Sequence, residues 1–454
     1  MSRIVPRPAS ARLLSLVAAS LLAAIAGPAA RAQHFDAHSF TLDNGMRVAV
    51  APNHRVPAVT QMVWYKVGAA DDPHGKSGLA HFLEHLMFKG TRATPAGAFS
   101  AAIAKNGGRD NAFTTEDYTV FHETVARDRL DLVMRLEADR MTGLVLDDKA
   151  VLPERDVVLE ERRMRIDNEP AALLQEQLRA TLFLHHPYRI PTIGWEIEIR
   201  KLGTADALAY YRDWYAPNNA ILVVAGDVEE AEVQTLAARY FGAVAAHPVA
   251  QRARVGEPEH HAAARIEMKS ARAAEPSWRR LYLAPSYRAG DTRHAYPLEV
   301  LAEILGGGAT SRLYKALVLD RELALSVDAS YDPGAIDLAT FDLSAAPKPG
   351  VPVAELEAAV DGELRRILEQ GVSDDEVRRA EERMGAAAAY AQDSLSGPAD
   401  IIGAALAIGQ TLDDVEAWPE RIGRVTAEEI AAAARDVLVE RNSATGILLP
   451  EHTS

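Results

Sequence analysis

A short pattern from the middle of this chain returns at its end, and this repetition constrains the fold more than any other feature. Residues 217–224 read PNNAILVV, and residues 441–450 read RNSATGILLP. The apolar run that follows the asparagines in each copy is typical of a short buried strand. After residue 265 the order of expected strands and helices also resembles the order before it. The sequence therefore predicts two similar halves of about 200 residues, an ordinary size for one domain.

Each half mixes strand and helix patterns. In the first half, Asp43-Asn44-Gly45 separates two short apolar runs, which indicates a β-hairpin. Residues 59–67 are rich in β-branched and aromatic residues and are typical of a strand. Residues 79–88 have the apolar run of a helix that begins after Ser77. We expect the α+β class, in which each half is a mostly antiparallel sheet packed with helices.

The first 32 residues, 1–32, have the features of a signal peptide. Three early arginines precede an apolar stretch at residues 13–26, and a small-residue cleavage site follows at residues 30–32. The alternative is an uncleaved membrane anchor, although the apolar stretch is short for a membrane span. We expect cleavage, an exported protein in the periplasm or outside the cell, and no stable membrane span afterwards.

The rest of the chain is expected to form two domains of the same fold. Residues 33–245 would be the first domain, with the metal-binding motif, and residues 265–454 the second, without it. Between them, residues 246–264 lose the periodicity of helices and strands around prolines and a glycine. This composition is typical of a linker.

Composition limits the chemistry that the chain can carry. It contains no cysteine, so disulfides are excluded and any metal site must use His, Asp or Glu. The formal net charge is −15, and the basic patch typical of nucleic-acid binding is missing from the sequence. We therefore expect no nucleic-acid partner.

The segment His81-Phe82-Leu83-Glu84-His85 is the strongest chemical signal. On a helix, His81 and His85 lie one turn apart on the same face and can bind one metal ion. Glu84 projects toward that face, where a carboxylate can take a proton from metal-bound water. Two histidines at this spacing are more often structural than metal-binding. The inner glutamate makes this an inverted zincin motif and leaves the two interpretations evenly balanced.

A catalytic zinc site needs a third protein ligand. Glu154 and Glu161 are seven residues apart, hence nearly on one face of a helix. One of the two can bind the metal while the other supports a ligand from outside the first coordination sphere. The spacing alone leaves open which residue takes which role.

The surrounding sequence resembles a known family. Residues 78–91, GLAHFLEHLMFKGT, are similar to the zinc segment of the pitrilysin/insulinase family, especially to the β subunit of the mitochondrial processing peptidase and its bacterial relatives. Residues 106–115 resemble the family's stretch ending in Asn-Ala-Tyr-Thr, with Phe113 in place of the tyrosine. The resemblance extends over essentially the whole mature chain and includes residues 154–161, 215–219 and 305–308.

The resemblance implies roles for the acidic and histidine residues. His81, His85 and Glu161 would bind one zinc ion per chain. Glu84 would be the general base, and Glu154 would hold a ligand histidine in place. Zinc is the metal that the family implies, although the same donor set could hold manganese or cobalt in vitro.

The resemblance also implies where substrate binds. Asn111 and Ala112 would lie on or next to an edge strand that pairs with an extended peptide. Such pairing gives affinity through backbone hydrogen bonds and makes little demand on side chains. Without the resemblance, Asn111 could equally be an ordinary turn residue.

One departure from the family pattern has consequences for activity. Active members contribute an Arg and a Tyr, spaced Arg-x6-Tyr, that stabilise the oxyanion. Val318 and Leu325 stand at those positions here, and neither side chain can donate a hydrogen bond. Three other candidates lie nearby but out of register: Arg312, Tyr314 and Arg321. We expect a related partner subunit to supply the missing pair in a heterodimer; a homodimer is the alternative assembly.

The sequence thus predicts a zinc metalloendopeptidase subunit that hydrolyses peptides or small unfolded segments. The alternative is a non-catalytic structural or assembly subunit of the same family. The intact set of His81, Glu84, His85 and Glu161 argues against that alternative, because a purely structural subunit has no reason to keep it.

Overall fold

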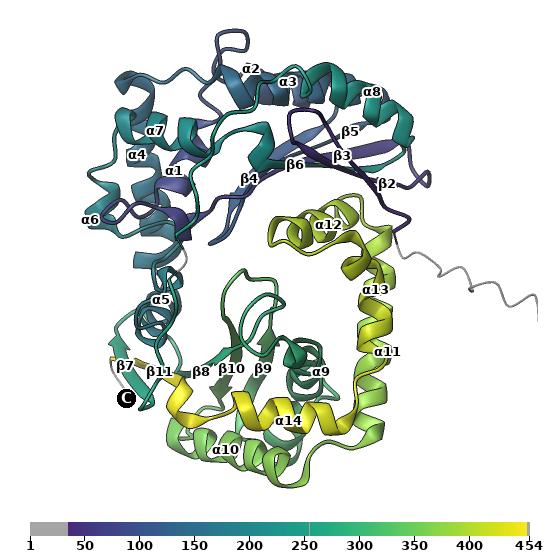
Figure 1. Ribbon diagram of the computed structural model, residues 1–454. Helices are drawn as coiled ribbons and strands as arrows, with labels where there is room; N and C mark the ends of the chain where they lie inside the picture. Colours follow the sequence, from purple (N-terminus) through teal and green to yellow (C-terminus); the bar gives the residue numbers. More distant parts are fainter. Residues whose placement is uncertain (1–34, 254, 452–454) are drawn as a thin grey trace, which may run out of the picture. The chain divides into compact units, whose positions relative to one another are not determined.

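The computed structural model describes residues 35–253 and 255–451, which form two β-sheets and the helices that cover them (Figure 1). The expected signal segment, residues 1–32, lies outside the described residues. Within the described ranges, no helix has both the length and the apolar character that crossing a bilayer requires.

The first sheet has six strands in the spatial order β1-β2-β6-β3-β5-β4. β2 and β6 run parallel, and every other neighbouring pair is antiparallel. The hairpin expected at residues 43–45 joins β1 to β2, and Gly45 takes the left-handed conformation at φ +86°. The strands are β1 (His38–Thr41), β2 (Arg47–Pro52), β3 (Ala58–Tyr65), β4 (Arg109–Thr114), β5 (Thr119–Ala126) and β6 (Ala220–Gly226).

The second sheet has five strands in the order β7-β11-β8-β10-β9. β7 and β11 run parallel, and the other neighbours are antiparallel. β6 and β11, which carry the repeated sequence pattern, therefore hold equivalent places between one parallel and one antiparallel neighbour. The predicted α+β class with two similar halves is confirmed. The strands are β7 (Ala264–Ser270), β8 (Ser277–Ala284), β9 (Ala324–Tyr331), β10 (Ala339–Pro347) and β11 (Ser443–Pro450).

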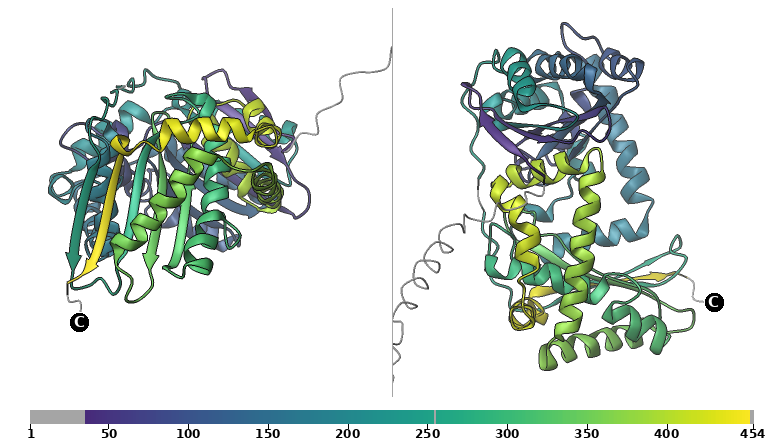
Figure 2. Two further views of the ribbon diagram at one scale, coloured as in Figure 1. Left: turned by 90° about the horizontal axis from the view of Figure 1, so that it is seen from below. Right: turned by 90° about the vertical axis from the view of Figure 1, so that its right-hand side faces the viewer.

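Most helices cover the face of the sheet in their own half. In the first half, helix side chains pack on alternate strand residues such as Val48, Val63 and Leu222. These helices are α1 (Leu79–Leu86), α2 (Ala98–Lys105), α3 (Leu130–Gly143) and α8 (Glu230–Tyr240), while α4 (Asp148–Arg162) and α7 (Thr204–Trp214) pack against α1. In the second half (Figure 2), α9 (Ala295–Gly306), α10 (Val353–Gln370) and α14 (Ala427–Val437) pack on the sheet, and α11 (Asp374–Asp393) and α13 (Leu412–Ile422) pack on α9.

Each half also sends one helix to the other half's sheet. α12 (Gly397–Ala407), from the second half, packs through Ile402 and neighbouring apolar residues on Met62 and Trp64 of the first sheet. α5 (Pro170–Leu182), from the first half, packs through Leu178 on Leu281 of the second sheet. Each sheet thus has helices on both faces, which is why the apolar run of β6 is buried along nearly its whole length.

The segment between the two sheets is irregular. Residues 246–253 and 255–263 carry no helix or strand, and β7 begins at Ala264. Glu257 accepts hydrogen bonds from the backbone N–H groups of residues 184–186, which ties this segment to the end of α5. The linker at residues 246–264 and the domain limits on either side of it remain predictions. Since α5 and α12 each pack on the sheet of the other half, the fold does not separate the two halves at this segment.

Candidate metal centre

Helix α1 begins at Leu79 because a carboxylate from the preceding loop caps it. The residue before it, Gly78, has φ +85° and no side chain that could act as a cap. Asp72 instead accepts hydrogen bonds from the backbone N–H groups of Gly78, Leu79 and Ala80 at 2.7, 3.1 and 2.8 Å. These are donors that a helix leaves unpaired at its start. All residues of α1 except His85 are buried.

Helix α4 carries the acidic candidates. Its start is capped by Asp147, whose carboxylate accepts a hydrogen bond from the N–H of Ala150 at 2.9 Å. The helix therefore begins at Asp148, and it ends at Arg162. A π-helical turn, η3 (Arg163–Asp167), continues it. Glu154 and Glu161 lie two turns apart on the side of α4 that contacts α1.

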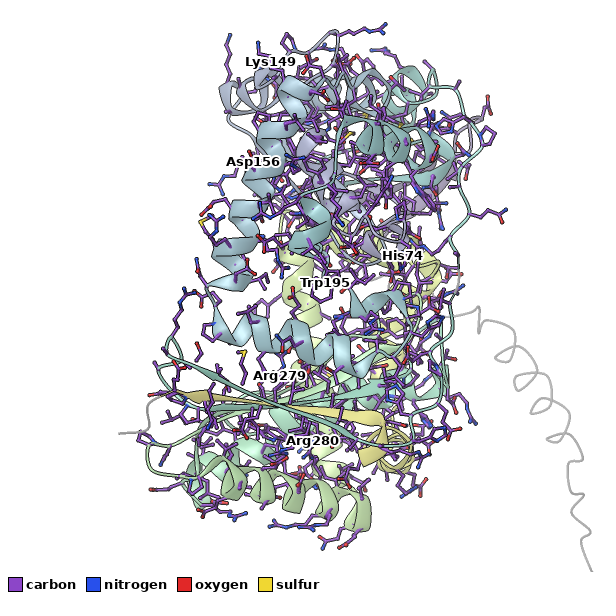
Figure 3. All side chains as sticks on the ribbon, turned by 90° about the vertical axis from the view of Figure 1, so that its left-hand side faces the viewer. His74, Lys149, Asp156, Trp195, Arg279 and Arg280 are labelled. Atoms are coloured by element: carbon purple, nitrogen blue, oxygen red, sulfur yellow. The ribbon has the colours of Figure 1, made fainter. Side chains whose placement is uncertain are left out.

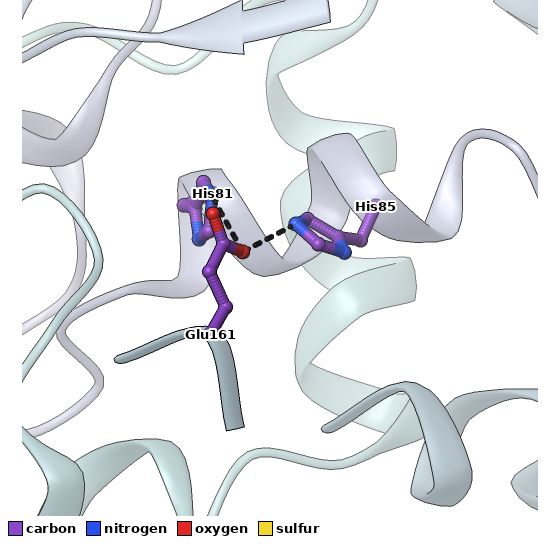
Figure 4. Close-up of side chains that lie close together, drawn as sticks. All are labelled: His81, His85 and Glu161. Carbon is purple, nitrogen blue, oxygen red and sulfur yellow. Dashed lines mark ion pairs between the residues drawn. The ribbon is translucent and has the colours of Figure 1, made fainter. Parts of the chain in front are cut away.

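Two histidines and one carboxylate converge between these helices (Figure 4). Nε2 of His85 lies 3.1 Å from Oε2 of Glu161, and Nε2 of His81 lies 3.7 Å from the same oxygen. The three groups can offer one donor atom each with all donors within 4.8 Å of one another. The structure therefore brings together the three residues that the sequence singled out as metal ligands.

The donor atoms are those that a cation would satisfy. Oε2 of Glu161 is buried and makes no regular hydrogen bond among the described residues, although Nε2 of His85 lies 3.1 Å and Nε2 of His81 3.7 Å from it. Buried polar atoms of this kind are normally paired, by protein, water or an ion. Two imidazole nitrogens and one carboxylate oxygen form a donor set that suits zinc and leaves a fourth position open. The residues present therefore fit a zinc ion.

Charged side chains surround this donor set on the α4 side. Nδ1 of His85 lies 3.0 Å from Oε1 of Glu154, which is buried and also forms an ion pair with Lys89. Nη1 of Arg165 lies 2.7 Å from Oε1 of Glu161. Spacing alone did not tell Glu154 from Glu161. In the structure Glu161 faces both histidines. Glu154 instead contacts Nδ1 of His85, the ring nitrogen that does not face Glu161.

The electrostatics of the two histidines differ. Burial, together with the neighbouring His85, lowers the pKa of His81 to about 4, so His81 is neutral near pH 7 as a ligand must be. Burial opposes the charge on His85 as well, but bonds to Glu154 and Glu161 outweigh it and raise the pKa of His85 to about 9. A metal that binds His85 must therefore displace a proton near neutral pH.

Glu84 lies beside the donor set and is held by the edge of the first sheet. Its side chain is buried, and its Oε2 accepts a hydrogen bond of 2.6 Å from Oγ1 of Thr114, the last residue of β4. Burial raises the pKa of Glu84, and the hydrogen bond from Thr114 opposes that rise. The sequence interpretation did not single out Thr114. The signal was the Asn-Ala-Phe-Thr stretch itself, which ends on this residue.

The two residues expected to meet substrate lie on β4. This strand pairs with β5 on one side and is the outer strand of the first sheet on the other. Asn111 is exposed and lies opposite His122, whereas Ala112 packs toward the helices on the Glu84 side. The structure thus places both on the same outer strand as Thr114, outside the group of close donor atoms.

The positions of the family's Arg and Tyr carry apolar side chains in the second half. Val318 belongs to a π-helical segment, η7 (Tyr314–Asp320), and Leu325 lies in β9 with 45% of its surface exposed. Arg312 is engaged by Glu376 through two hydrogen bonds of 2.8 and 2.6 Å. The structure therefore does not bring Arg312 to the register that Val318 occupies.

A second cluster of possible ligands differs from the first in its surroundings. Asp291, His294 and Asp436 also hold donor atoms close together, but both carboxylates are exposed. Asp291 is bound through both oxygens to Arg293 at 2.9 and 2.6 Å, and it caps the short helix that follows. The guanidinium already neutralises this carboxylate, so an ion is not needed to explain the arrangement.

Comparison with known proteins gives the same family on both halves. Residues 47–195 match the family model described as insulinase (peptidase family M16), and residues 201–384 match the peptidase M16 inactive domain. The chain is 33% identical to an uncharacterized zinc protease of Streptomyces coelicolor over 413 residues, which is 89% of this chain and 87% of the relative.

Two comparisons lead to Helicobacter pylori. The chain is 32% identical to its zinc protease PqqE over 365 residues, 78% of this chain and 80% of the relative. The crystal structure of a protease from Helicobacter pylori superposes with a TM-score of 0.85 at 27% identity, covering 91% of this chain and 99% of that one. With its two similar halves and the His-x-x-Glu-His helix in the first of them, the chain belongs to the insulinase family of peptidases, family M16.

Proposed function

We propose that this chain is the zinc-bearing subunit of a metalloendopeptidase that hydrolyses peptides. The observation that carries the proposal is the convergence of His81, His85 and Glu161 beside Glu84. That relatives at 33% and 32% identity are named zinc proteases supports the choice of metal. We assign the three converging residues to one zinc ion per chain, with Glu154 orienting His85 from behind.

The chemistry follows from the positions of these residues. Zinc, when bound, supplies a Lewis acid that makes water a nucleophile near neutral pH. Glu84 takes the proton of the attacking water and delivers it to the leaving amine as a general base and then a general acid. Thr114 fixes one oxygen of this carboxylate, so the base keeps its orientation during turnover.

We further propose that substrate binds along the free side of β4. An extended peptide there would add one antiparallel strand to the first sheet, with Asn111 and Ala112 beside it. Support comes from Thr114, which belongs to the same strand and touches Glu84. A peptide held by β4 would thus be held next to the general base.

A partner subunit completes the proposed enzyme. Val318 and Leu325 cannot donate hydrogen bonds, and loss of one oxyanion donor typically costs a factor of about 10² to 10³ in rate. We propose that a related chain supplies the missing donors, because a second copy would carry the same Val318 and Leu325. The features of residues 1–32 support export to the periplasm or beyond.

The decisive experiment replaces the proposed base and leaves the ligands intact. Glu84→Gln should retain one zinc per chain but lose hydrolysis of a mixed peptide library when combined with the co-purified partner. Glu160→Gln is the matched control, because Glu160 is exposed, lies next to Glu161 and pairs with the equally exposed Arg163. This control should keep both zinc and activity.

Two outcomes would contradict the proposal in different ways. If wild type and Glu84→Gln, each with the partner present, were equally inert toward all peptides, the chain would be a structural subunit. If the wild type alone, zinc-loaded and monomeric by light scattering, cleaved peptides at the rate of the assembled enzyme, the need for a partner would be refuted.

A further inference from the structure

One loop touches both helices of the metal centre. We call residues 190–198 the bridging loop; Trp195 on it is labelled in Figure 3. It includes the start of α6 (Glu196–Ile199) and lies against the first turn of α1 and the last turn of α4. Because α1 carries His81 and His85 and α4 carries Glu161, this loop is in a position to set the distance between the two sets of ligands.

The contact with α1 is made through Ser77, the residue before the helix's N-cap. Its backbone N–H donates to Oε2 of Glu198 at 2.8 Å, and its Oγ accepts from the N–H of Trp195 at 2.9 Å. Ser77 is 1% exposed, so both bonds are shielded from water. The start of α1 is therefore bonded to the bridging loop from two directions.

Two glycines bring the backbones of α1 and the bridging loop into direct contact. A Cβ atom on Gly78 would lie 2.4 Å from the carbonyl oxygen of Ile193, and one on Gly194 would lie 2.4 Å from that of Ser77. Both glycines also have positive φ angles, at +85° and +89°, which other residues rarely adopt. There is no room at either position for the loop and the helix to move closer or to rotate freely.

The contact with α4 is made by Arg162, the neighbour of Glu161. Its guanidinium donates to the carbonyl oxygen of Gly194 at 2.9 Å and forms two bonds of 2.8 and 2.9 Å with Glu176 on α5. Asp167 lies 3.5 Å away. Arg162 is 5% exposed, and a buried guanidinium is tolerated only when it is paired in this way. The end of α4 is therefore bonded to the same peptide unit that rests on the start of α1.

We propose that Arg162 is a positioning residue that holds Glu161 in register with His81 and His85 through the bridging loop. The inference rests on the proposed zinc role of these three residues. A metal site tolerates only small errors in the distances between its donors, and groups behind the ligands typically change metal affinity by a factor of about 10 to 100. Without Arg162, α4 keeps its packing but loses the bond that fixes it to the start of α1.

The test compares two neighbouring arginines in the purified full chain. Arg162→Met should raise the dissociation constant for zinc, measured by competition with a chromophoric chelator, by about tenfold or more. Arg163→Met is the matched control, because Arg163 is exposed and pairs with Glu160 one turn away; its zinc affinity should equal that of wild type. Arg162→Lys, which keeps the charge but loses the paired geometry, should fall between wild type and Arg162→Met.

A second readout separates positioning from simple loss of stability. The visible absorption of bound Co²⁺ depends on the arrangement of its ligands, so Arg162→Met should change the spectrum of the cobalt form at saturation. If Arg162→Met failed to fold, the milder Glu176→Gln would carry the test, with the same direction of change in affinity and spectrum. The double variant Arg162→Lys/Glu176→Gln should bind zinc more weakly than wild type. Its loss of binding free energy should not exceed the sum of the losses in the two single variants, because the two residues act as one unit.

Failure of this inference and failure of the proposed function give different results. If Arg162→Met lowered the unfolding temperature of the metal-free chain yet bound zinc with wild-type affinity and spectrum, Arg162 would be merely structural and the inference would be overturned. If instead wild type and His81→Ala bound zinc equally weakly, the metal assignment itself would be wrong.

Discussion

Thr114 donates a hydrogen bond of 2.6 Å to Oε2 of Glu84, and this bond joins the outer strand of the first sheet to the helix that carries the histidines. It places the proposed base next to the strand on which we expect substrate to lie. The proposed general base and the proposed peptide-binding strand are therefore connected through one pair of side chains.

Replacing Thr114 tests this link. Thr114→Val keeps the shape of the side chain but removes the donor, and a hydrogen bond to a charged group contributes about 1.5 to 3 kcal/mol. We expect kcat to fall by about tenfold or more while zinc content stays at the wild-type level. Thr114→Ser should restore most of the rate. A variant with wild-type kcat would show that Glu84 needs no such support.

Replacing Glu154 should weaken metal binding without changing the binding of peptide. Its carboxylate binds Nδ1 of His85 at 3.0 Å, so Glu154→Gln leaves a weaker partner for the ligand histidine. We expect zinc affinity to fall by about 10 to 100-fold, measured by chelator competition. Asp156→Asn is the control, since Asp156 lies exposed on the same helix (Figure 3). Equal affinities in the two variants would contradict the role of Glu154.

Glu299 should make the folding stability of the chain depend on pH through a group in the second half. Burial raises its pKa to about 7, although Tyr287 and the indole N–H of Trp418 donate hydrogen bonds to it and oppose the rise. The folded chain thus holds this proton more tightly than the unfolded chain, whose glutamate has a pKa near 4.5. The contribution to stability is full below about pH 4.5 and is lost as the pH rises through about 7.

Glu299→Gln, which cannot ionise, should remove this dependence. Relative to the variant, wild type should lose about 3 kcal/mol of unfolding free energy between pH 4.5 and 8, because each tenfold difference in acid dissociation constant between the folded and unfolded chain corresponds to roughly 1.4 kcal/mol. Urea unfolding at both pH values measures the difference, and the fluorescence of Trp418 should titrate with a midpoint near 7 only in wild type. A difference that stays constant with pH would refute the assignment.

Gly403 is where α12 meets the first sheet. A Cβ atom at this position would lie 2.0 Å from Cε2 of Trp64, which is fully buried. Gly403→Ala should therefore lower the unfolding free energy by about 1 to 3 kcal/mol, although alanine favours helix. Gly385→Ala, in α11 with open space around it, is the control and should raise stability by up to about 1 kcal/mol. Urea unfolding compares them; a neutral Gly403→Ala would show that the helix can shift.

Much of the site could be predicted because its signals are local. The spacing of His81, Glu84 and His85 places them on one short helix, and the seven-residue interval of Glu154 and Glu161 places those on another. The hairpin at Gly45 and the buried strand β6 likewise follow from turn chemistry and apolar runs within a few residues.

The parts that the sequence did not reveal depend on partners far along the chain. Asp72 caps α1 across a loop that has no recognisable motif. The sequence gives Arg162 no feature that distinguishes it from the other arginines of a charged helix, and its contact with Gly194 is evident only in the folded chain. α5 and α12 each pack an apolar face on the sheet of the other half. Hydrophobic periodicity predicts which face of a helix is buried, but it does not predict which of the two sheets that face packs on. Glu299 looks like a surface residue of an amphipathic helix, but Trp418 of α13 lies against it in the folded chain.

The exchange of α5 and α12 means that each half depends on the other to complete its core. A protease that cuts the irregular segment at residues 246–253 or 255–263 would leave two fragments that stay associated. The reason is that α5 would still pack on the second sheet and α12 on the first. The nicked fragments should therefore migrate together under native conditions and separate only in denaturant. Such a chain melts as one unit, and a chain truncated after the first sheet would expose the apolar surface around Trp64 to water.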